Sequence, residues 1–217
     1  MLAGLILGPT AYSRAQTPDG ADHKDRLDTI LRRIQSHYQK TNTLKARFTE
    51  NIVAADGRKR ERSGTVYYQK PGKMHWDFDE PKGETIVSDG RELYTYAPDL
   101  NQVMKAPLEQ VFKTSAPVAF LLGVGDIKRD FKAALPASPP SDGLVHVILT
   151  PKMGGELIDL GVDPHTYDLT SMKVEDQLGN STTFHLQDRQ TNVALNDSLF
   201  RFEVPKGADI VEAPAPR

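Results

Sequence analysis

The chain has 217 residues, a formal net charge of −2 and no cysteine. Its length suits one domain or two small ones, and its 26% charged and 38% hydrophobic residues are typical of a globular chain. The near-neutral charge gives no basic field to attract nucleic acid, so we expect no nucleic-acid partner. The absence of cysteine excludes disulfides, thiol catalysis and cysteine-ligated metal sites.

The N-terminal segment has features of an export signal. Met1 to Gly8 is a short apolar stretch, and small residues then lead to Ser13-Arg14-Ala15, which is similar to an A-x-A cleavage pattern. The stretch is too short to span a bilayer. We expect residues 1–15 to be a secretory signal or its remnant, and 16–217 to form a single exported domain. The alternative is a disordered leader.

Residues 22–40 are predicted to form a helix. Leu27, Ile30, Leu31, Ile34 and Tyr38 recur at helical spacing and share one face. That face must be buried against another apolar surface.

From Leu44 onward the apolar period changes to two, which is typical of strands. Strands are predicted at 44–52, 66–68, 74–78, 84–88, 91–96, 102–105, 144–150, 157–162, 169–175 and 181–186. A closing segment at 199–204 precedes Pro205 and the tail, where we expect the fold to end. About ten or eleven short strands in sequence indicate an antiparallel meander.

The run from Ser63 to Pro81 is the most informative of these. It predicts two strands joined at a Pro-Gly turn, and the period of two places Met74, Trp76 and Phe78 on one face. Such a large apolar face is either core or a binding surface.

The middle of the chain predicts helices instead. Leu108 and Val111 indicate a short helix, and 116–123 indicates another that is apolar nearly all round, with Pro117 at its first position. A sheet of so many strands curls and needs a cover. If the helical covers are fixed, the face beneath them is core; if they lift, it is a cavity for an apolar ligand.

Motifs for catalysis or metal binding are missing from the sequence. There is no GxSxG, HExxH, GxxxxGK[ST] or GxGxxG motif, and the six histidines include no i,i+4 pair. Asp77, Asp79 and Glu80 offer the one acid/base alternative, a hydrolase, but a solvated strand end explains them better. We therefore expect no enzyme activity, no metal and no cofactor.

Three segments together resemble the LolA family of periplasmic lipoprotein carriers. The family pattern G-x-ϕ-x-ϕ-x-[KR]-P-x-x-ϕ-x-W is matched from Gly64 to Trp76. Residues 86–96 match a VSDG…L-x-x-Y segment, and 116–122 match a Thr/Ala-Pro-x-x-x-Leu-Leu helix. Their order and spacing hold over most of the chain.

The resemblance implies an unclosed antiparallel β half-barrel covered by a helical lid. It implies a monomeric periplasmic carrier that binds lipoprotein acyl chains, accepts them from an inner-membrane ABC lipoprotein-releasing transporter and delivers them to an outer-membrane acceptor. The alternative is a lipid- or lipoprotein-sensing module of a periplasmic regulatory system. An acceptor usually carries a lipid anchor, and the absence of cysteine argues against that role.

The resemblance also assigns candidate site residues. Lys70 stands where the family commonly has arginine, so we expect it to act in lid closure and cargo transfer, as a weaker latch than an arginine fork. Met74 and Pro71 are candidates for transporter docking, and Met74 is equally well explained as a core or cavity methionine. The expected acyl-chain cavity residues are Phe48, Val66, Tyr68, Trp76, Phe78, Ile86 and Leu93, and the expected lid residues are Val118, Leu121 and Leu122. The alternative for both groups is a static core.

Overall fold

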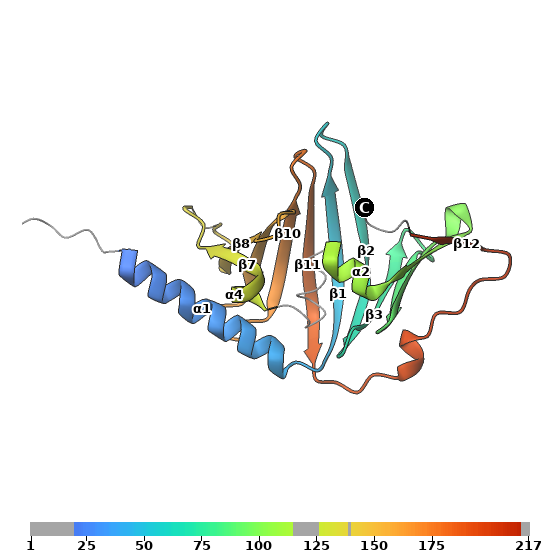
Figure 1. Ribbon diagram of the computed structural model, residues 1–217, viewed down its shortest axis with the longest axis horizontal. Helices are drawn as coiled ribbons and strands as arrows, with labels where there is room; N and C mark the ends of the chain where they lie inside the picture. The colour runs from blue at the N-terminus through green and yellow to red at the C-terminus, as the bar shows by residue number, and fades with distance from the viewer. Residues whose placement is uncertain (1–19, 115–125, 139, 214–217) are drawn as a thin grey trace, which may run out of the picture.

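The computed structural model describes residues 20–114, 126–138 and 140–213. Its centre is one 12-stranded sheet in the order β12-β6-β5-β4-β3-β2-β1-β11-β10-β9-β8-β7 (Figure 1). Neighbouring strands are antiparallel except β12 and β6, which are parallel. The end strands β12 and β7 do not pair with each other, so the sheet is open, as predicted for a half-barrel.

The elements follow one another along the chain in this order. They are α1 (Gly20–Lys40), β1 (Thr43–Val53), β2 (Lys59–Gln69), β3 (Lys73–Glu80), β4 (Thr85–Asp89), β5 (Glu92–Ala97), η1 (Pro98–Leu100), β6 (Gln102–Pro107), α2 (Leu108–Thr114), α4 (Ile127–Asp130), β7 (Phe131–Ala134), β8 (Val145–Pro151), β9 (Leu157–Val162), β10 (Leu169–Glu175), β11 (Ser181–Thr191), η2 (Asp197–Phe200) and β12 (Asp209–Glu212).

The two halves of the sheet meet at β1. This strand pairs with β2 on one side and with β11 on the other, so that Glu50 lies opposite Arg62 in β2 and opposite Phe184 in β11. The β1–β11 pairing joins segments more than a hundred residues apart. It places side chains of β10 and β11 beside those of the N-terminal meander.

Helix α1 covers the half of the sheet that the C-terminal strands form (Figure 1). Its buried residues Ile30, Leu31 and Ile34 belong to one core cluster with Val147 and Leu160 of β8 and β9. This burial provides the apolar surface that the helical periodicity of 22–40 requires. The C-terminal end of α1 then lies beside β1 and β2.

The C-terminal segment packs on the face of β3 to β5 that carries the side chains of Lys73 and Tyr94, which we call the outer face. Phe200 is buried, the rings of Phe202 and Tyr94 stack with centroids 5.1 Å apart, and Asp197 lies 2.8 Å from the ammonium group of Lys73. Tyr94 alternates along β5 with Leu93, which points to the other face. The outer face here is therefore covered, and the apolar side chains of the inner face line a cavity.

The structure corrects one detail of the predicted strand pattern. Pro205 does not end the fold, because β12 follows it and brings the sheet to 12 strands; all four β12 residues are exposed, so the strand lacks an alternating buried pattern. The closing segment, for which no strand was predicted, begins within the 3-10 helix η2. The predicted helix over 116–123 lies outside the described residues.

Candidate functional site

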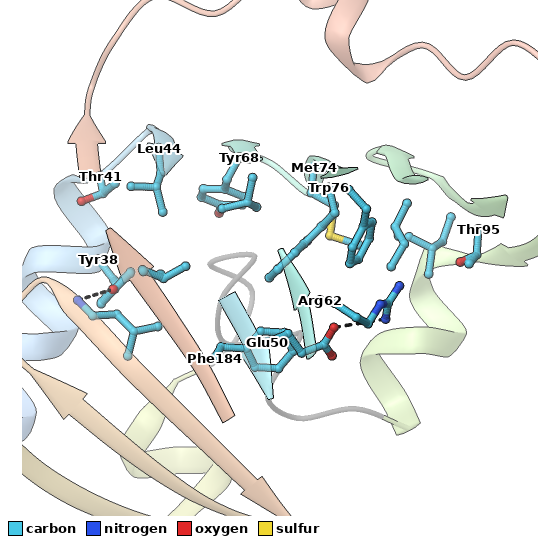
Figure 2. Close-up of a pocket in the computed structure, with 16 residues that line it drawn as sticks. Tyr38, Thr41, Leu44, Glu50, Arg62, Tyr68, Met74, Trp76, Thr95 and Phe184 are labelled. Carbon is cyan, nitrogen blue, oxygen red and sulfur yellow. Dashed lines mark hydrogen bonds and ion pairs between the residues drawn. The ribbon is translucent and has the colours of Figure 1, made fainter. Parts of the chain in front are cut away.

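An apolar cavity of about 250 Å³ lies on the inner face of the sheet, beside the end of α1 (Figure 2). Carbon atoms make up most of its wall, and the few polar groups are spread over its edges. The lining residues are Tyr38, Thr41, Leu44, Glu50, Arg62, Val66, Tyr68, Met74, Trp76, Phe78, Ile86, Leu93, Thr95, Leu169, Phe184 and Leu186.

Aromatic side chains from β1, β3 and β11 pack together at the wall of this cavity. The ring of Trp76 packs edge-on against those of Phe48 and Phe184, with centroid distances of 4.7 and 5.5 Å. Phe48 also packs edge-on against Phe78 at 5.1 Å. Gly64 makes room for Phe48, because a Cβ at this position would lie 2.8 Å from the ring. These contacts fix the aromatic wall in place.

Two charged residues, Arg62 and Glu50, line one side of the cavity, and Glu84 pairs with Arg62. The Arg62 guanidinium is 3.1 Å from a Glu50 carboxylate oxygen, donates to Glu84, and lies 4.0 Å from the centroid of the Phe78 ring. The side chains of Arg62 and Glu50 are only 12% and 9% exposed. Burial, with a smaller contribution from Glu84, raises the pKa of Glu50 against the opposing effect of Arg62.

On the side of the cavity opposite to Arg62, polar contacts attach the end of α1 to the sheet. The backbone N–H of Leu169 donates to the Tyr38 hydroxyl at 3.1 Å, and the Lys70 ammonium group donates to the carbonyl oxygens of Tyr38 and Gln39. These carbonyls belong to the last turn of α1, where the helix dipole favours a cation. Partial burial lowers the pKa of Lys70.

Comparison with known proteins identifies the family. Residues 39–203 match the family described as "Outer membrane lipoprotein carrier protein LolA". The chain is a member of the LolA family. An "Outer-membrane lipoprotein carrier protein" from Methylobacillus flagellatus is 33% identical, over 82% of this chain and 86% of that protein. A protein of the same name from Dechloromonas aromatica is 32% identical over 95% of both chains.

A solved structure shares the fold at much lower identity. An uncharacterized conserved protein from Thermus thermophilus superimposes with a TM-score of 0.54 and 14% identity, over 86% of this chain and 98% of that one. The LolA family consists of periplasmic carriers and not of enzymes.

No helix in the described part of the chain combines the length and apolar character that a membrane crossing needs.

Most of the residues that the LolA resemblance assigned to the acyl-chain cavity lie on the cavity wall. The exception is Phe48, which is 1% exposed and packs behind Trp76. Trp76 itself is only partly buried. The residues in the wall are Val66, Tyr68, Trp76, Phe78, Ile86 and Leu93.

The remaining assignments fall in different places. The expected lid residues Val118, Leu121 and Leu122 lie outside the described residues, so a latch between them and Lys70 stays a prediction. Met74 is 7% exposed and lines the cavity, whereas Pro71 is exposed at the β2–β3 turn. These two residues do not form one outer surface, and their role in transporter docking also stays a prediction.

The carboxylates considered for catalysis lie away from the cavity. Asp77, Asp79 and Glu80 are exposed, and Asp79 pairs with Arg47 on the outer face. Among the described residues no group of three or more histidine, aspartate or glutamate side chains could hold a metal ion.

The sequence predicted cavity residues only from the segments that form β1 to β5, and it missed those that α1, β10 and β11 contribute. Leu169, Phe184 and Leu186 come from β10 and β11, Tyr38 comes from the last turn of α1, and Thr41 directly follows that helix. The alternation of Phe184 and Leu186 along their strand was the available signal that these two side chains share one face. Their place beside Trp76 depends on the β1–β11 pairing, which no local pattern reveals.

Proposed function

We propose that this LolA-family chain carries lipoproteins through the periplasm by holding their acyl chains in the cavity beside the end of α1. The observation that carries the proposal is the aromatic and aliphatic wall around a space of about 250 Å³. An acyl chain gains about 0.8 kcal/mol for each CH₂ group that leaves water, so such a wall offers a large driving force without specific polar contacts.

The cavity must widen to take a complete cargo. By comparison with the ~150 Å³ cavity that accepts benzene, this space holds on the order of ten carbon atoms. A triacylated cysteine brings several times more carbon than that. We infer that loading moves the end of α1 away from β10, which breaks the contact between Tyr38 and Leu169.

The partners of the proposed cycle are an inner-membrane ABC transporter that releases lipoproteins and an outer-membrane acceptor that receives them. The chain would act as a monomer, one cargo molecule to one carrier. Release requires that no single contact be too strong, which fits a wall whose contacts are mostly dispersive.

The test is an ATP-dependent loading reaction. Residues 16–217 are incubated with inner-membrane vesicles that contain the transporter, and the released protein is examined by native mass spectrometry. A one-to-one complex with a triacylated lipoprotein, formed only with ATP, is the expected result. If the protein stays empty while another carrier is loaded by the same vesicles, the carrier proposal is wrong.

A further inference from the structure

The charged residues of the cavity wall stand where strand alternation puts apolar ones. Glu50 follows Ala46 and Phe48 on the inner face of β1, and Arg62 precedes Val66 on the inner face of β2. Burying charge in an apolar wall is costly, because each ion loses its hydration. A wall that needed only to hold hydrocarbon would not require buried charged residues.

The hydrogen-bonding capacity of these groups is only partly used. Arg62 is held by Glu50 and Glu84, but its Nε–H is buried and has no acceptor among the described residues. One Glu50 oxygen is 3.1 Å from Arg62 but makes no well-aligned hydrogen bond, and the buried Tyr68 hydroxyl also has no partner there. Three polar groups of one cavity wall are therefore left incompletely satisfied.

The charge of the cluster restricts what could satisfy it. Arg62 is already paired with two carboxylates, and the other guanidinium that acts on Glu50, that of Arg60, is exposed to solvent. A phosphate or a fatty-acid carboxylate would therefore have to compete with Glu50 and Glu84 for Arg62. An ammonium group could not accept a hydrogen bond from the Arg62 Nε–H. A neutral carbonyl oxygen meets both conditions, because it accepts from a cationic donor and brings no charge.

We propose that Arg62, supported by Glu50 and Glu84, forms a polar subsite in the cavity for the ester carbonyl at the head of an acyl chain. The inference rests on the proposed function and adds an orientation to it. The carbonyl-bearing head lies beside Arg62 and Thr95, and the hydrocarbon extends along the aromatic wall toward Tyr38, on the opposite side in Figure 2.

The test compares ligands that differ only in the carbonyl. An ester-linked diacylglycerol and its ether-linked dialkyl analogue of equal chain length compete with a fluorescent apolar probe for the full chain. The same comparison uses a synthetic triacylated lipopeptide and its ether-linked counterpart. We expect about tenfold tighter binding of the ester, the size of one hydrogen bond to a charged group.

The variant that tests the subsite is Glu50→Gln, Arg62→Met, Glu84→Gln, which removes all three charges together and leaves no unpaired ion. In this variant the ester and the ether ligand of each pair should bind with equal affinity, so that the ester preference is lost. The matched control is Arg47→Met, Asp79→Asn, which removes an ion pair between β1 and β3 on the outer face and should keep the preference.

The outcomes separate the two proposals. An ester preference for the lipopeptide alone assigns the carbonyl to lipoproteins, and a preference in both pairs extends the subsite to glycerolipids. Equal affinities for ester and ether, or a preference that survives in the triple variant, would overturn the subsite and leave the carrier function standing. Failure of the wild-type chain to bind any of these ligands would overturn both.

Discussion

Lys70 Nζ lies 3.3 Å from the carbonyl oxygen of Gln39 and also donates to that of Tyr38, so one side chain of the β2–β3 turn region holds the last turn of α1. Because Tyr38 is also part of the cavity wall, this contact links the helix end to the binding site.

Removing this contact should loosen the end of α1. In Lys70→Leu the last carbonyls of the helix lose their cation, so we expect faster hydrogen exchange around residues 38–41 and a stability loss of about 1 kcal/mol. Transfer of cargo should slow as well. Lys70→Arg should restore protection. The control Lys73→Leu removes a cation that pairs with Asp197 on the outer face, and it should leave exchange at α1 unchanged. If hydrogen exchange at the end of α1 and cargo transfer are both normal in Lys70→Leu, Lys70 does not hold the helix end or act in transfer.

Gly64 should tolerate no side chain. A Cβ there would lie 2.1 Å from the carbonyl oxygen of Asp77 and 2.8 Å from the Phe48 ring, so strand β3 or the aromatic wall would have to move. We expect Gly64→Ala to lower the free energy of unfolding by about 3 kcal/mol in urea denaturation.

Gly57→Ala is the comparison for that measurement. Nothing lies within 4 Å of a Cβ at Gly57, so only its φ of +85° opposes the change, and the cost should be about 1 kcal/mol. Equal costs at the two positions would contradict the packing account of the aromatic wall.

His146 should make stability depend on pH. Burial alone would lower the pKa of His146, but its ring nitrogens lie 2.8 Å from Asp159 and 3.0 Å from Asp142, and these hydrogen bonds and charges raise it overall. A raised folded-state pKa means that the contribution is complete below the unfolded value of about 6.5 and is lost as the pH rises through the folded value.

The variant His146→Gln measures this contribution. Its deficit in unfolding free energy should be about 2 kcal/mol below pH ~6 and should shrink as the pH rises. Urea denaturation at a series of pH values gives the deficit directly. His165→Gln, at an exposed position, is the control for replacing a histidine by glutamine. A deficit that grows with pH would reverse the assigned charge state.

Local patterns predicted the parts of the site that lie on neighbouring strands. Met74, Trp76 and Phe78 alternate within one strand, so their common face could be read directly from the sequence. Phe184 could not be placed beside Trp76, because their proximity comes from a pairing between β1 and β11 that depends on the whole sheet.

The charged part of the wall was missed for a different reason. A charged residue in a strand normally indicates the solvent face, and Glu50 and Arg62 break that rule because they neutralise each other across two strands. Strand β12 was missed because exposed Ile210 and Val211, flanked by acidic residues, form no alternating pattern.

The most direct test of the central claim uses Trp76, the single tryptophan of the chain, which lines the cavity. Bromine atoms on an acyl chain quench tryptophan fluorescence only at close contact. A triacylated lipopeptide with brominated acyl chains should therefore quench Trp76 emission strongly on forming a one-to-one complex, and the unbrominated lipopeptide should not. A one-to-one complex without quenching would show that the acyl chains lie elsewhere, and would contradict the account.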